Sequence, residues 1–360
     1  MKKKLVITFL AFALTFIVFS CFVSEVVAAD KPIVWKVQGF TPAGTLYDTW
    51  GKHFAGLVEE LSGGRIKIEW FPSGTIVSAL EAPDAVGDGI LDAEYGYSGL
   101  WSGHNEAFPL FCSTPGLFSD PWDAALWMKE GGGEELWNEM LEPYNCHGII
   151  VGIHHSETFL WSNKPIRTVE DMKGLKLRMM PVMGKVLEEH GMSVVFMSGG
   201  EIIPSLEKKV LDAAEYSIPA FDKTLGFQDV CKYFHFPGIH QPSAMQEIVI
   251  NKDKWEALPD DLKRIVEYAA QLNIFYCYSQ SALLNVKAIE EFEKMGLEKV
   301  VLEKEAVETL TRWANEWFEK HQNENPWMAK IRESQKAFGK MYFPYKKSLE
   351  SPYPDWAFED

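Results

Sequence analysis

The sequence contains nearly the same phrase twice, as GILDAEY at 89–95 and VLDAAEY at 210–216. In each case a stretch with helical spacing leads into the phrase, and the phrase itself has the short apolar character of a strand. An aspartate follows leucine at both joints, as Asp92 and Asp212. This shared context predicts two units of similar architecture within one chain. Chance recurrence of the common Leu-Asp-Ala triplet is the alternative.

Strand and helix patterns alternate in both halves of the chain. The first half reads as strand, helix, strand, helix, strand, from IVWKVQG at 33–39 through RIKIEWFP at 65–72 to the first repeat phrase. The second half repeats this order from GLKLRMM at 174–180 to the second phrase. Such alternation predicts an α/β fold around mostly parallel sheets. A chain of 360 residues is also long enough for two hydrophobic cores.

We expect the two units to be lobes with a cleft between them. Two long extended segments, 147–163 and 238–255, have an apolar strand at one end and a polar cluster inside, as connections between lobes would. The resulting division assigns 30–154 with about 242–270 to lobe 1. It assigns 155–241, with parts of the C-terminal region, to lobe 2.

The C-terminal part of the chain has helical periodicity throughout. Residues from about 259 to 296 predict a long helix, or a helix pair, that spans the lobes. Residues 306–342 predict further helices, with a break at Pro326. These last helices carry four large apolar side chains: Trp313, Trp317, Met328 and Phe338.

Residues 1–29 have the pattern of a signal peptide. Three lysines near the start precede an uncharged, mostly apolar stretch at 5–23, and VAA at 27–29 offers a cleavage site. The prediction is a periplasmic mature protein; an uncleaved membrane anchor or a lipid on Cys21 are the alternatives. Cleavage removes three lysines and Glu25, which changes the formal charge from −16 to −18. A chain this acidic is not expected to bind nucleic acid or an anionic membrane.

The cysteines of the mature chain are not expected to form disulfides or a metal site. Their spacing is wide and irregular, which favours buried free thiols at Cys112, Cys146, Cys231 and Cys277. Cys231 is followed by His235 and His240, but YFHFPG between them reads as a strand end and a turn, so we do not expect the three to converge on zinc.

Motifs for catalysis are absent from the sequence. There is no P-loop, no Gly-x-Ser-x-Gly and no His-Glu-x-x-His. An enzyme remains the rival from another class, as a metal-assisted hydrolase with Glu157 or Glu215 as its base.

Several polar and aromatic side chains fall at strand ends or inside the connecting segments, where two-lobed α/β proteins bind ligands. Arg178 ends the strand GLKLR, and a guanidinium can hold a carboxylate with two parallel hydrogen bonds. Carboxylates near an arginine predict either a salt bridge or a bound cation. We expect Trp101 to close the cleft from the opposite wall. The full candidate set is Arg178, Glu157, Glu215, Tyr216, Gln241, Trp101 and Tyr97.

The sequence resembles the solute-binding proteins of tripartite ATP-independent periplasmic (TRAP) transporters over almost the whole mature chain. It is most similar to the subgroup that binds 2-oxo and 2-hydroxy monocarboxylates with a cation. The segments that carry the resemblance are LSGGRIKIEWFPSGTIV (61–77), DAVGDGILDAEYG (84–96), NKPIRTVEDMKGLKLR (163–178), GGEIIPSLEKKVLDAAEYS (199–217) and INKDKWEALP (250–259).

The resemblance implies a role for each polar position. Arg178 would hold the substrate carboxylate, and Glu215 with Tyr216 would help to hold calcium or sodium. The subgroup has Gln where this chain has Glu157, and Glu where it has Gln241, so the two types are exchanged. We expect the exchange to keep the cation site and its charge. The alternative is that Glu157 bonds the substrate itself and the cation is lost.

The resemblance also implies partners. A small organic acid would be delivered to the membrane permease subunits of the transporter, and the helices at 306–342 would form a swapped homodimer. These helices could instead fold back on their own lobe. A receptor that serves a membrane sensor rather than a permease is a further alternative.

Overall fold

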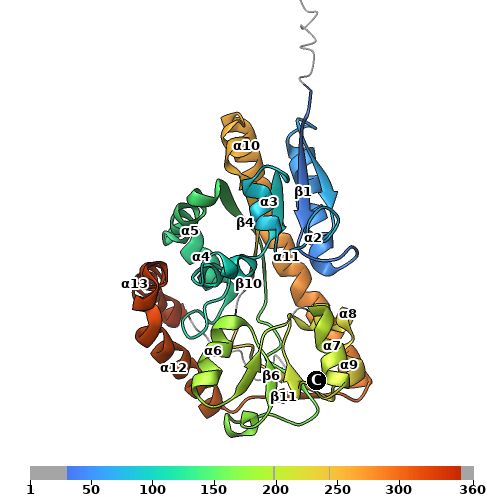
Figure 1. Cartoon of the computed structure of the whole chain (residues 1–360), viewed down its shortest axis with the longest axis vertical. Helices are drawn as coiled ribbons and strands as arrows, with labels where there is room; N and C mark the ends of the chain where they lie inside the picture. The colour runs from blue at the N-terminus through green and yellow to red at the C-terminus, as the bar shows by residue number, and fades with distance from the viewer. Residues whose placement is uncertain (1–30, 198, 243, 350–360) are drawn as a thin grey trace, which may run out of the picture. The chain divides into compact units, whose positions relative to one another are not determined.

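The computed structural model describes residues 31–197, 199–242 and 244–349. The expected signal peptide at 1–29 lies outside the described residues. The described residues from Val34 onward form one compact unit that contains two β-sheets (Figure 1). We call the part built around the five-stranded sheet lobe 1 and the part built around the six-stranded sheet lobe 2. No helix of the described residues has the length and apolar character needed to cross a bilayer.

Both sheets are mixed, with one strand in each that runs antiparallel to its two neighbours. This strand is β10 in lobe 1 and β5 in lobe 2. These strands are next to the points where the chain passes between the sheets. In order across the sheet, lobe 1 contains β2 (Ile66–Phe71), β1 (Ile33–Gly39), β3 (Ala93–Gly96), β10 (Ala244–Asn251) and β4 (Cys146–His154). Lobe 2 contains β11 (Glu298–Val301), β9 (Tyr233–Phe236), β5 (Trp161–Ser162), β8 (Ala213–Ala214), β6 (Lys176–Arg178) and β7 (Ser193–Val195).

Helices connect the strands in the alternating order that the sequence predicts. In the lobe 1 half of the chain they are α2 (Leu46–Leu61), α3 (Ala82–Gly87), η1 (Ser98–Gly103), η2 (Phe108–Phe111), α4 (Pro121–Glu130), α5 (Gly133–Leu141), η3 (Glu142–Tyr144) and α10 (Lys252–Glu256). In the lobe 2 half they are η4 (Glu170–Met172), α6 (Pro181–Glu189), α7 (Gly199–Glu207), α8 (Pro219–Leu225) and α9 (Phe227–Val230). The α/β fold class is therefore confirmed.

The two repeat phrases form equivalent joints. The side chain of Asp92 accepts a hydrogen bond from the backbone N–H of Lys36 at 2.7 Å, and Asp212 accepts one from the N–H of Lys176 at 2.9 Å. In each lobe the strand that follows the aspartate pairs in parallel with the strand that carries the lysine. The same side chain thus fastens the same type of strand pair, which supports internal duplication over chance.

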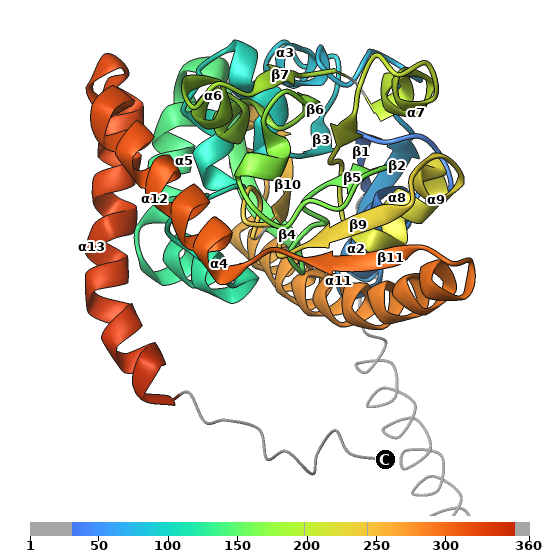
Figure 2. The ribbon, with the colours of Figure 1, turned by 90° about the horizontal axis from the view of Figure 1, so that it is seen from below.

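The C-terminal helices behave as the sequence predicts, with a long helix and a break at Pro326. The helix α11 (Asp260–Lys294) contacts α2 and β4 of lobe 1 and α8 and β11 of lobe 2. It is followed by α12 (Lys304–His321), η5 (Gln322–Glu324) and α13 (Pro326–Leu349). Figure 2 shows α11 along one edge of the described chain and α13 along another.

The four large apolar side chains of the last helices, which we call the apolar anchors, all pack against other parts of the same chain. Trp317, Met328 and Phe338 are at most 7% exposed, and Trp313 stacks on His190 with ring centroids 3.8 Å apart. This packing corresponds to the alternative in which these helices fold back on their own chain.

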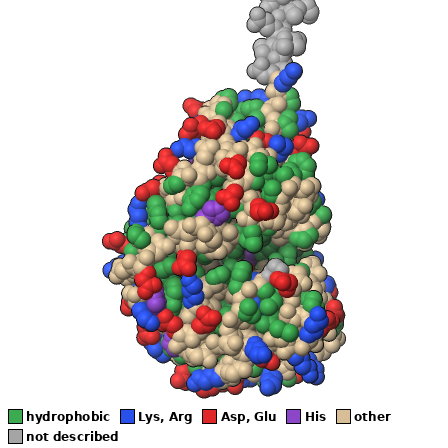
Figure 3. Space-filling model, viewed as in Figure 1, with side chains coloured by type: hydrophobic (Ala, Val, Ile, Leu, Met, Phe, Trp, Pro, Cys, Tyr) green, Lys and Arg blue, Asp and Glu red, His purple; other side chains and the backbone are tan. Residues whose placement is uncertain are grey.

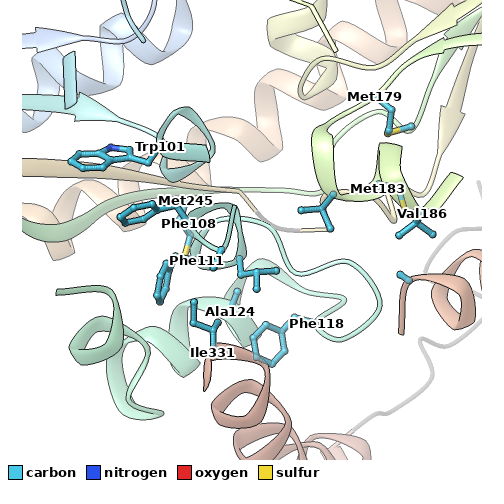
Figure 4. Close-up of a cluster of buried hydrophobic side chains, with 14 of the residues drawn as sticks. Trp101, Phe108, Phe111, Phe118, Ala124, Met179, Met183, Val186, Met245 and Ile331 are labelled. Atoms are coloured by element: carbon cyan, nitrogen blue, oxygen red, sulfur yellow. The ribbon is translucent and has the colours of Figure 1, made fainter. Parts of the chain in front are cut away.

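Hydrophobic packing continues from lobe 1 into lobe 2. Figure 4 shows Trp101, Phe108 and Phe111 of lobe 1 in one group, and Met179 and Met183 of lobe 2 in another. All of these residues belong to one cluster of buried side chains. The four cysteines of the described residues are buried free thiols, as predicted.

Lobe 1 also buries two carboxyl groups on one face of its sheet. Glu94 on β3 accepts a hydrogen bond from the indole N–H of Trp101 at 2.8 Å, and Glu247 on β10 accepts one from the hydroxyl of Ser98. The second carboxyl oxygen of each has no hydrogen-bond partner in the described part of the chain. Burial raises the pKa of both Glu94 and Glu247 to about 8.

These two carboxyls predict that the protein loses stability as the pH rises. Their folded-state pKa lies above the ordinary value of 4.5, so the folded protein retains protons that the unfolded chain releases. Their contribution is complete below pH 4.5 and is lost as the pH rises through about 8. The free energy of unfolding should fall by roughly 1 kcal/mol per carboxyl for each pH unit in this window. Urea unfolding at several pH values measures it.

The variants Glu94→Gln and Glu247→Gln should flatten this dependence, because an amide fills the same space without a proton to lose. The exposed Glu130→Gln is the matched control and should leave the slope unchanged. A slope that is the same in all four proteins would contradict the assignment.

Candidate functional site

Two short segments connect β4 to β5 and β9 to β10, and they lie against each other between the sheets. The first carries Glu157, and the second carries Gly238, His240 and Gln241. The backbone N–H of Glu157 donates to the carbonyl of Gln241 at 3.4 Å. A side chain at Gly238 would place its Cβ only 2.1 Å from the carbonyl oxygen of Glu157, so the close approach of the segments requires glycine there. This contact brings side chains from both segments to one place.

The second element of the site is an ion pair from the lobe 2 sheet. Arg178 ends β6, and Glu215 follows the paired strand β8. The guanidinium Nη1 donates to Glu215 Oε1 at 2.5 Å and to the Glu215 carbonyl at 2.9 Å. Arg178 is 3% exposed and Glu215 is fully buried. The guanidinium also lies over the rings of Phe196 and Tyr216, at 5.2 and 5.5 Å from their centroids.

The two elements meet at His240. Its Nε2 lies 3.3 Å from Glu157 Oε2 and 3.6 Å from Glu215 Oε2. The amide of Gln241 donates to the other oxygen of Glu157 at 3.1 Å. One ligand atom from each of Glu157, Glu215 and His240 lies within 4.8 Å of the other two. We call Arg178, Glu215, Glu157, His240 and Gln241 the junction cluster.

The charges of the junction cluster depend on each other. Burial opposes ionisation of Glu215, but Arg178 and His240 outweigh it and lower its pKa. Burial raises the pKa of Glu157 to about 7, although His240 acts in the other direction. Burial would lower the pKa of His240, but the two carboxylates outweigh it and raise its pKa to about 9. A protonated imidazole therefore favours the close approach of the two carboxyl groups.

A buried hydrogen-bonded chain supports the cluster from one side. His154 Nδ1 donates to the carbonyl of His155 at 2.8 Å, so its Nε2 accepts from the hydroxyl of Tyr47 at 3.0 Å. The Tyr47 hydroxyl in turn lies 2.6 Å from that of Ser217. Nε2 of His154 is 4.0 Å from Glu157 Oε1. Burial lowers the pKa of His154 to about 4, so this ring is neutral at physiological pH.

Most of the residues singled out from the sequence converge. Arg178, Glu215, Glu157 and Gln241 form the cluster, and the ring of Tyr216 packs beside Arg178. Tyr97 lies near the cluster. Burial raises the pKa of its hydroxyl, and the nearby Cys112 and Glu157 raise it further.

Trp101 requires a correction, because it does not close the cleft. Its side chain is 1% exposed, and its indole N–H is bound to the buried Glu94. It packs against Phe108, Tyr144 and His104 in the core of lobe 1. The 3₁₀ turn η1 directs this ring into the core rather than between the lobes.

Sequence reasoning missed His240 and Tyr47. His240 was considered only for a zinc site with Cys231 and His235, yet His235 instead bonds the carbonyl of Leu160 and the N–H of Ile166. The useful signal was its position beside Gln241 in a segment that crosses between the sheets. Tyr47 is remote in the sequence, at the start of α2, and nothing local marks it.

Three buried atoms of the cluster lack hydrogen-bond partners in the described part of the chain: Glu215 Oε2, Gln241 Oε1 and His240 Nδ1. Unpaired buried oxygens are costly unless a ligand or ion satisfies them. Two carboxylates and an amide oxygen form a donor set that suits a hard cation, and the guanidinium suits a carboxylate. The residues present therefore fit a bound cation with an organic acid.

The face that Figure 3 displays is indented near the middle of the described chain, and acidic and basic side chains are scattered over it among apolar ones. A separate cavity of about 740 Å³ is lined by parts of the 104–106 loop, α6, α12 and α13, among them Lys185 and His321. It contains none of the junction cluster.

Two sheet-centred lobes, crossing segments and a charged cluster between them define a solute receptor of the two-lobed class. Residues 39–325 match the family described as "Bacterial extracellular solute-binding protein, family 7" (DctP). The chain belongs to this family of extracellular solute receptors, which includes the solute-binding proteins of TRAP transporters.

Relatives and solved structures agree with this assignment. A monocarboxylate 2-oxoacid-binding periplasmic protein of Nostoc sp. strain PCC 7120 is 26% identical over 93% of this chain and 92% of its own. A TRAP periplasmic solute-binding protein of Colwellia psychrerythraea with bound calcium and pyruvate has a TM-score of 0.82 at 25% identity, covering 89% of this chain and 98% of its own. The corresponding protein of Pseudoalteromonas atlantica, with sodium and pyruvate, has a TM-score of 0.81 at 25% identity, covering 89% and 97%.

The close approach at Gly238 yields a stability prediction. Gly238→Ala places a methyl group against the Glu157 carbonyl, so the crossing segments must separate and the free energy of unfolding should fall by about 1–3 kcal/mol. Gly56→Ala in α2 is the control, because nothing lies within 4 Å of its added Cβ and alanine favours a helix. Urea unfolding compares the two. Equal stability of both variants would show that the segments do not pack as described.

Proposed function

We propose that this protein is a TRAP receptor for a small 2-oxo or 2-hydroxy monocarboxylate, bound together with a cation, and that it delivers the acid to the membrane permease subunits. Arg178 holds the carboxylate of the acid. Glu157 and Glu215 hold the cation, with further oxygen from Gln241 and from Tyr216. The observation that carries the proposal is the contact between Gln241 and Glu157 beside the Arg178–Glu215 pair.

That contact explains the exchange of residue types that the sequence suggests. The amide nitrogen of Gln241 lies 3.1 Å from a carboxyl oxygen of Glu157. A carboxylate moved from one segment to the other therefore stays beside the same cation position. The charge of the site is therefore unchanged by the exchange. Both the cation and its second carboxylate are retained.

Counting charges favours a divalent cation with a monocarboxylate. A cation bound beside His240 disfavours its protonated form, so in the loaded site Arg178 contributes one positive charge and Glu157 with Glu215 contribute two negative charges. A divalent ion brings the total to one positive charge, which a monoanion neutralises; sodium brings it to zero. Calcium is therefore our first candidate and sodium the second. Transition metals bind an imidazole nitrogen such as that of His240 more readily than calcium or sodium does. A test of the cation must therefore include a transition metal.

No residue of the site needs to react with the ligand. Closure of the two lobes around the bound acid makes the loaded receptor distinguishable from the free one, which is what delivery requires. A role as a receptor for a membrane sensor uses the same site and remains the second candidate. The hydrolase alternative has no support in the cluster, because the guanidinium and imidazole already engage both carboxylates.

The periplasmic location and a cleaved signal peptide at 1–29 belong to this proposal. So does the division into lobe 1 (30–154 with about 242–270) and lobe 2 (155–241 with parts of the C-terminal region). A homodimer through 306–342 would have to use α13 side chains other than the large apolar ones that already pack within the chain. Met341, Tyr345 and Leu349 remain at least 60% exposed there.

Thermal unfolding of the exported, chelator-treated protein tests the ligand and the cation together. Pyruvate with calcium should raise the midpoint more than either alone, because both stabilise only the folded state. Glu157→Gln should weaken the calcium-dependent part of pyruvate binding by ~10-fold or more, since a cation ligand is lost. Sodium and zinc serve as alternative ions, and 2-hydroxy acids and dicarboxylates as alternative ligands.

The double variant Glu157→Gln with Gln241→Glu is the matched control. It returns the carboxylate to the other segment and should restore calcium-dependent binding. Unchanged calcium dependence in Glu157→Gln alone would remove Glu157 from the cation site. No shift with any acid would overturn the proposed ligand class.

A further inference from the structure

The outer face of α11 is unusually apolar for a surface that no other described part of the chain covers. Its inner face packs on both lobes through residues such as Val266, Cys277 and Phe292. On the outer face, five large apolar side chains are between 52% and 67% exposed: Tyr268, Leu272, Phe275, Leu283 and Val286. Figure 2 shows the helix at the edge of the described chain. Contiguous exposed apolar surface of this kind is typical of protein–protein contacts.

The spacing of these residues is that of a helix-pairing seam. Steps of four and three residues alternate along the outer face through Tyr268, Leu272, Phe275, Ser279, Ala282 and Val286. This is the repeat by which two helices pack along their length. Ser279 does not interrupt it, because its hydroxyl donates to the carbonyl of Phe275 at 2.8 Å and is satisfied within the helix.

The order of side-chain sizes along this seam identifies the partner. The N-terminal half of the seam carries the large residues and its C-terminal half carries the smaller ones, while the exposed Leu283 lies beside the seam. When two copies lie antiparallel, aligned at the level of Cys277, each layer joins a large residue of one copy with a smaller residue of the other. The layers are Tyr268 with Val286, Leu272 with Ala282, and Phe275 with Ser279. Alternating large and small side chains is how facing helices fill the space between them.

A parallel pair would stack identical residues instead. Phe275 would then face Phe275 and Ser279 would face Ser279, which leaves crowded layers next to empty ones. The seam is therefore self-complementary in one direction only, as a two-fold symmetric interface requires.

Charges near the ends of the seam favour the same direction. Antiparallel packing brings Arg264 of one copy to the level of Glu290 and Glu293 of the other, whereas parallel packing would bring like charges together. Asp261 also falls opposite this acidic end of the other copy, but it is paired with Arg65 of its own chain at 2.6 Å. Glu290 and Glu293 have exposed pairs with Lys294 and Lys299 of their own chain, at the longer distances of 3.8 and 3.9 Å. Arg264 has no salt bridge within the described residues and is exposed.

We propose that a second copy of this chain docks on the outer face of α11, and that the two α11 helices pack antiparallel around a two-fold axis near Cys277. The proposal doesn't depend on the ligand of the junction cluster. It differs from a dimer through 306–342, whose apolar anchors are occupied within the chain.

Sedimentation of the exported protein over a micromolar concentration series tests the dimer. The wild type should form dimers, and Phe275→Glu should raise the dimer dissociation constant by ~100-fold or more, because a carboxylate would be buried at the centre of the seam. Met341→Glu on α13 is the matched control, since Met341 is equally accessible at 70% exposure, and it should leave the dimer intact. A wild type that stays monomeric, or a dimer that only Met341→Glu disrupts, would overturn the proposal.

Cross-linking tests the direction of packing. Leu272→Cys and Ala282→Cys should each give little disulfide-linked dimer alone under mild oxidation, but an equimolar mixture should give an efficient heterologous cross-link. Efficient cross-linking of Leu272→Cys with itself would contradict the antiparallel arrangement. Both positions are on the helix surface, and an unchanged thermal midpoint for the reduced variants verifies that they fold.

Discussion

Burial of four ionisable groups at the junction of the two sheets is the constraint on which the site depends. Arg178, Glu215, Glu157 and His240 are each at most 3% exposed. Charges buried in this way persist only when opposite charges and hydrogen-bond donors surround them. The requirement fixes how closely the two crossing segments approach, and it explains the glycine at 238. It also leaves Glu215 Oε2 and Gln241 Oε1 without a hydrogen-bond partner among the described residues, which is the property a receptor needs at its binding site.

The two lobes share a plan but only one of them carries the arginine. Lys36 and Lys176 occupy equivalent positions at the Asp92 and Asp212 joints, so Gln38 is the lobe 1 counterpart of Arg178. Gln38 donates to the carbonyl of Val77 and accepts from the N–H groups of Ile76 and Val77. One copy of the duplicated position thus stabilises a loop, while the other faces the junction. The two lobes therefore share the same strand arrangement, but only lobe 2 carries a charged side chain at this position.

Much of this organisation could be predicted from local patterns. The strand–helix alternation, the repeated joints and the long helix α11 depend on periodicity and turn residues, which are local properties. Arg178 and Glu215 could be placed because parallel strands end at the same sheet edge. His240, Tyr47 and the true position of Trp101 could not be placed. Irregular crossing segments and 3₁₀ turns have no fixed period, so the direction of a side chain there depends on packing with distant residues.

A crystal structure of the exported protein grown with pyruvate and calcium tests the central claim most directly. The account predicts the pyruvate carboxylate on the Arg178 guanidinium and the ion in contact with carboxylate oxygens of both Glu157 and Glu215. An acid bound away from Arg178, or an ion that contacts neither glutamate, would contradict it.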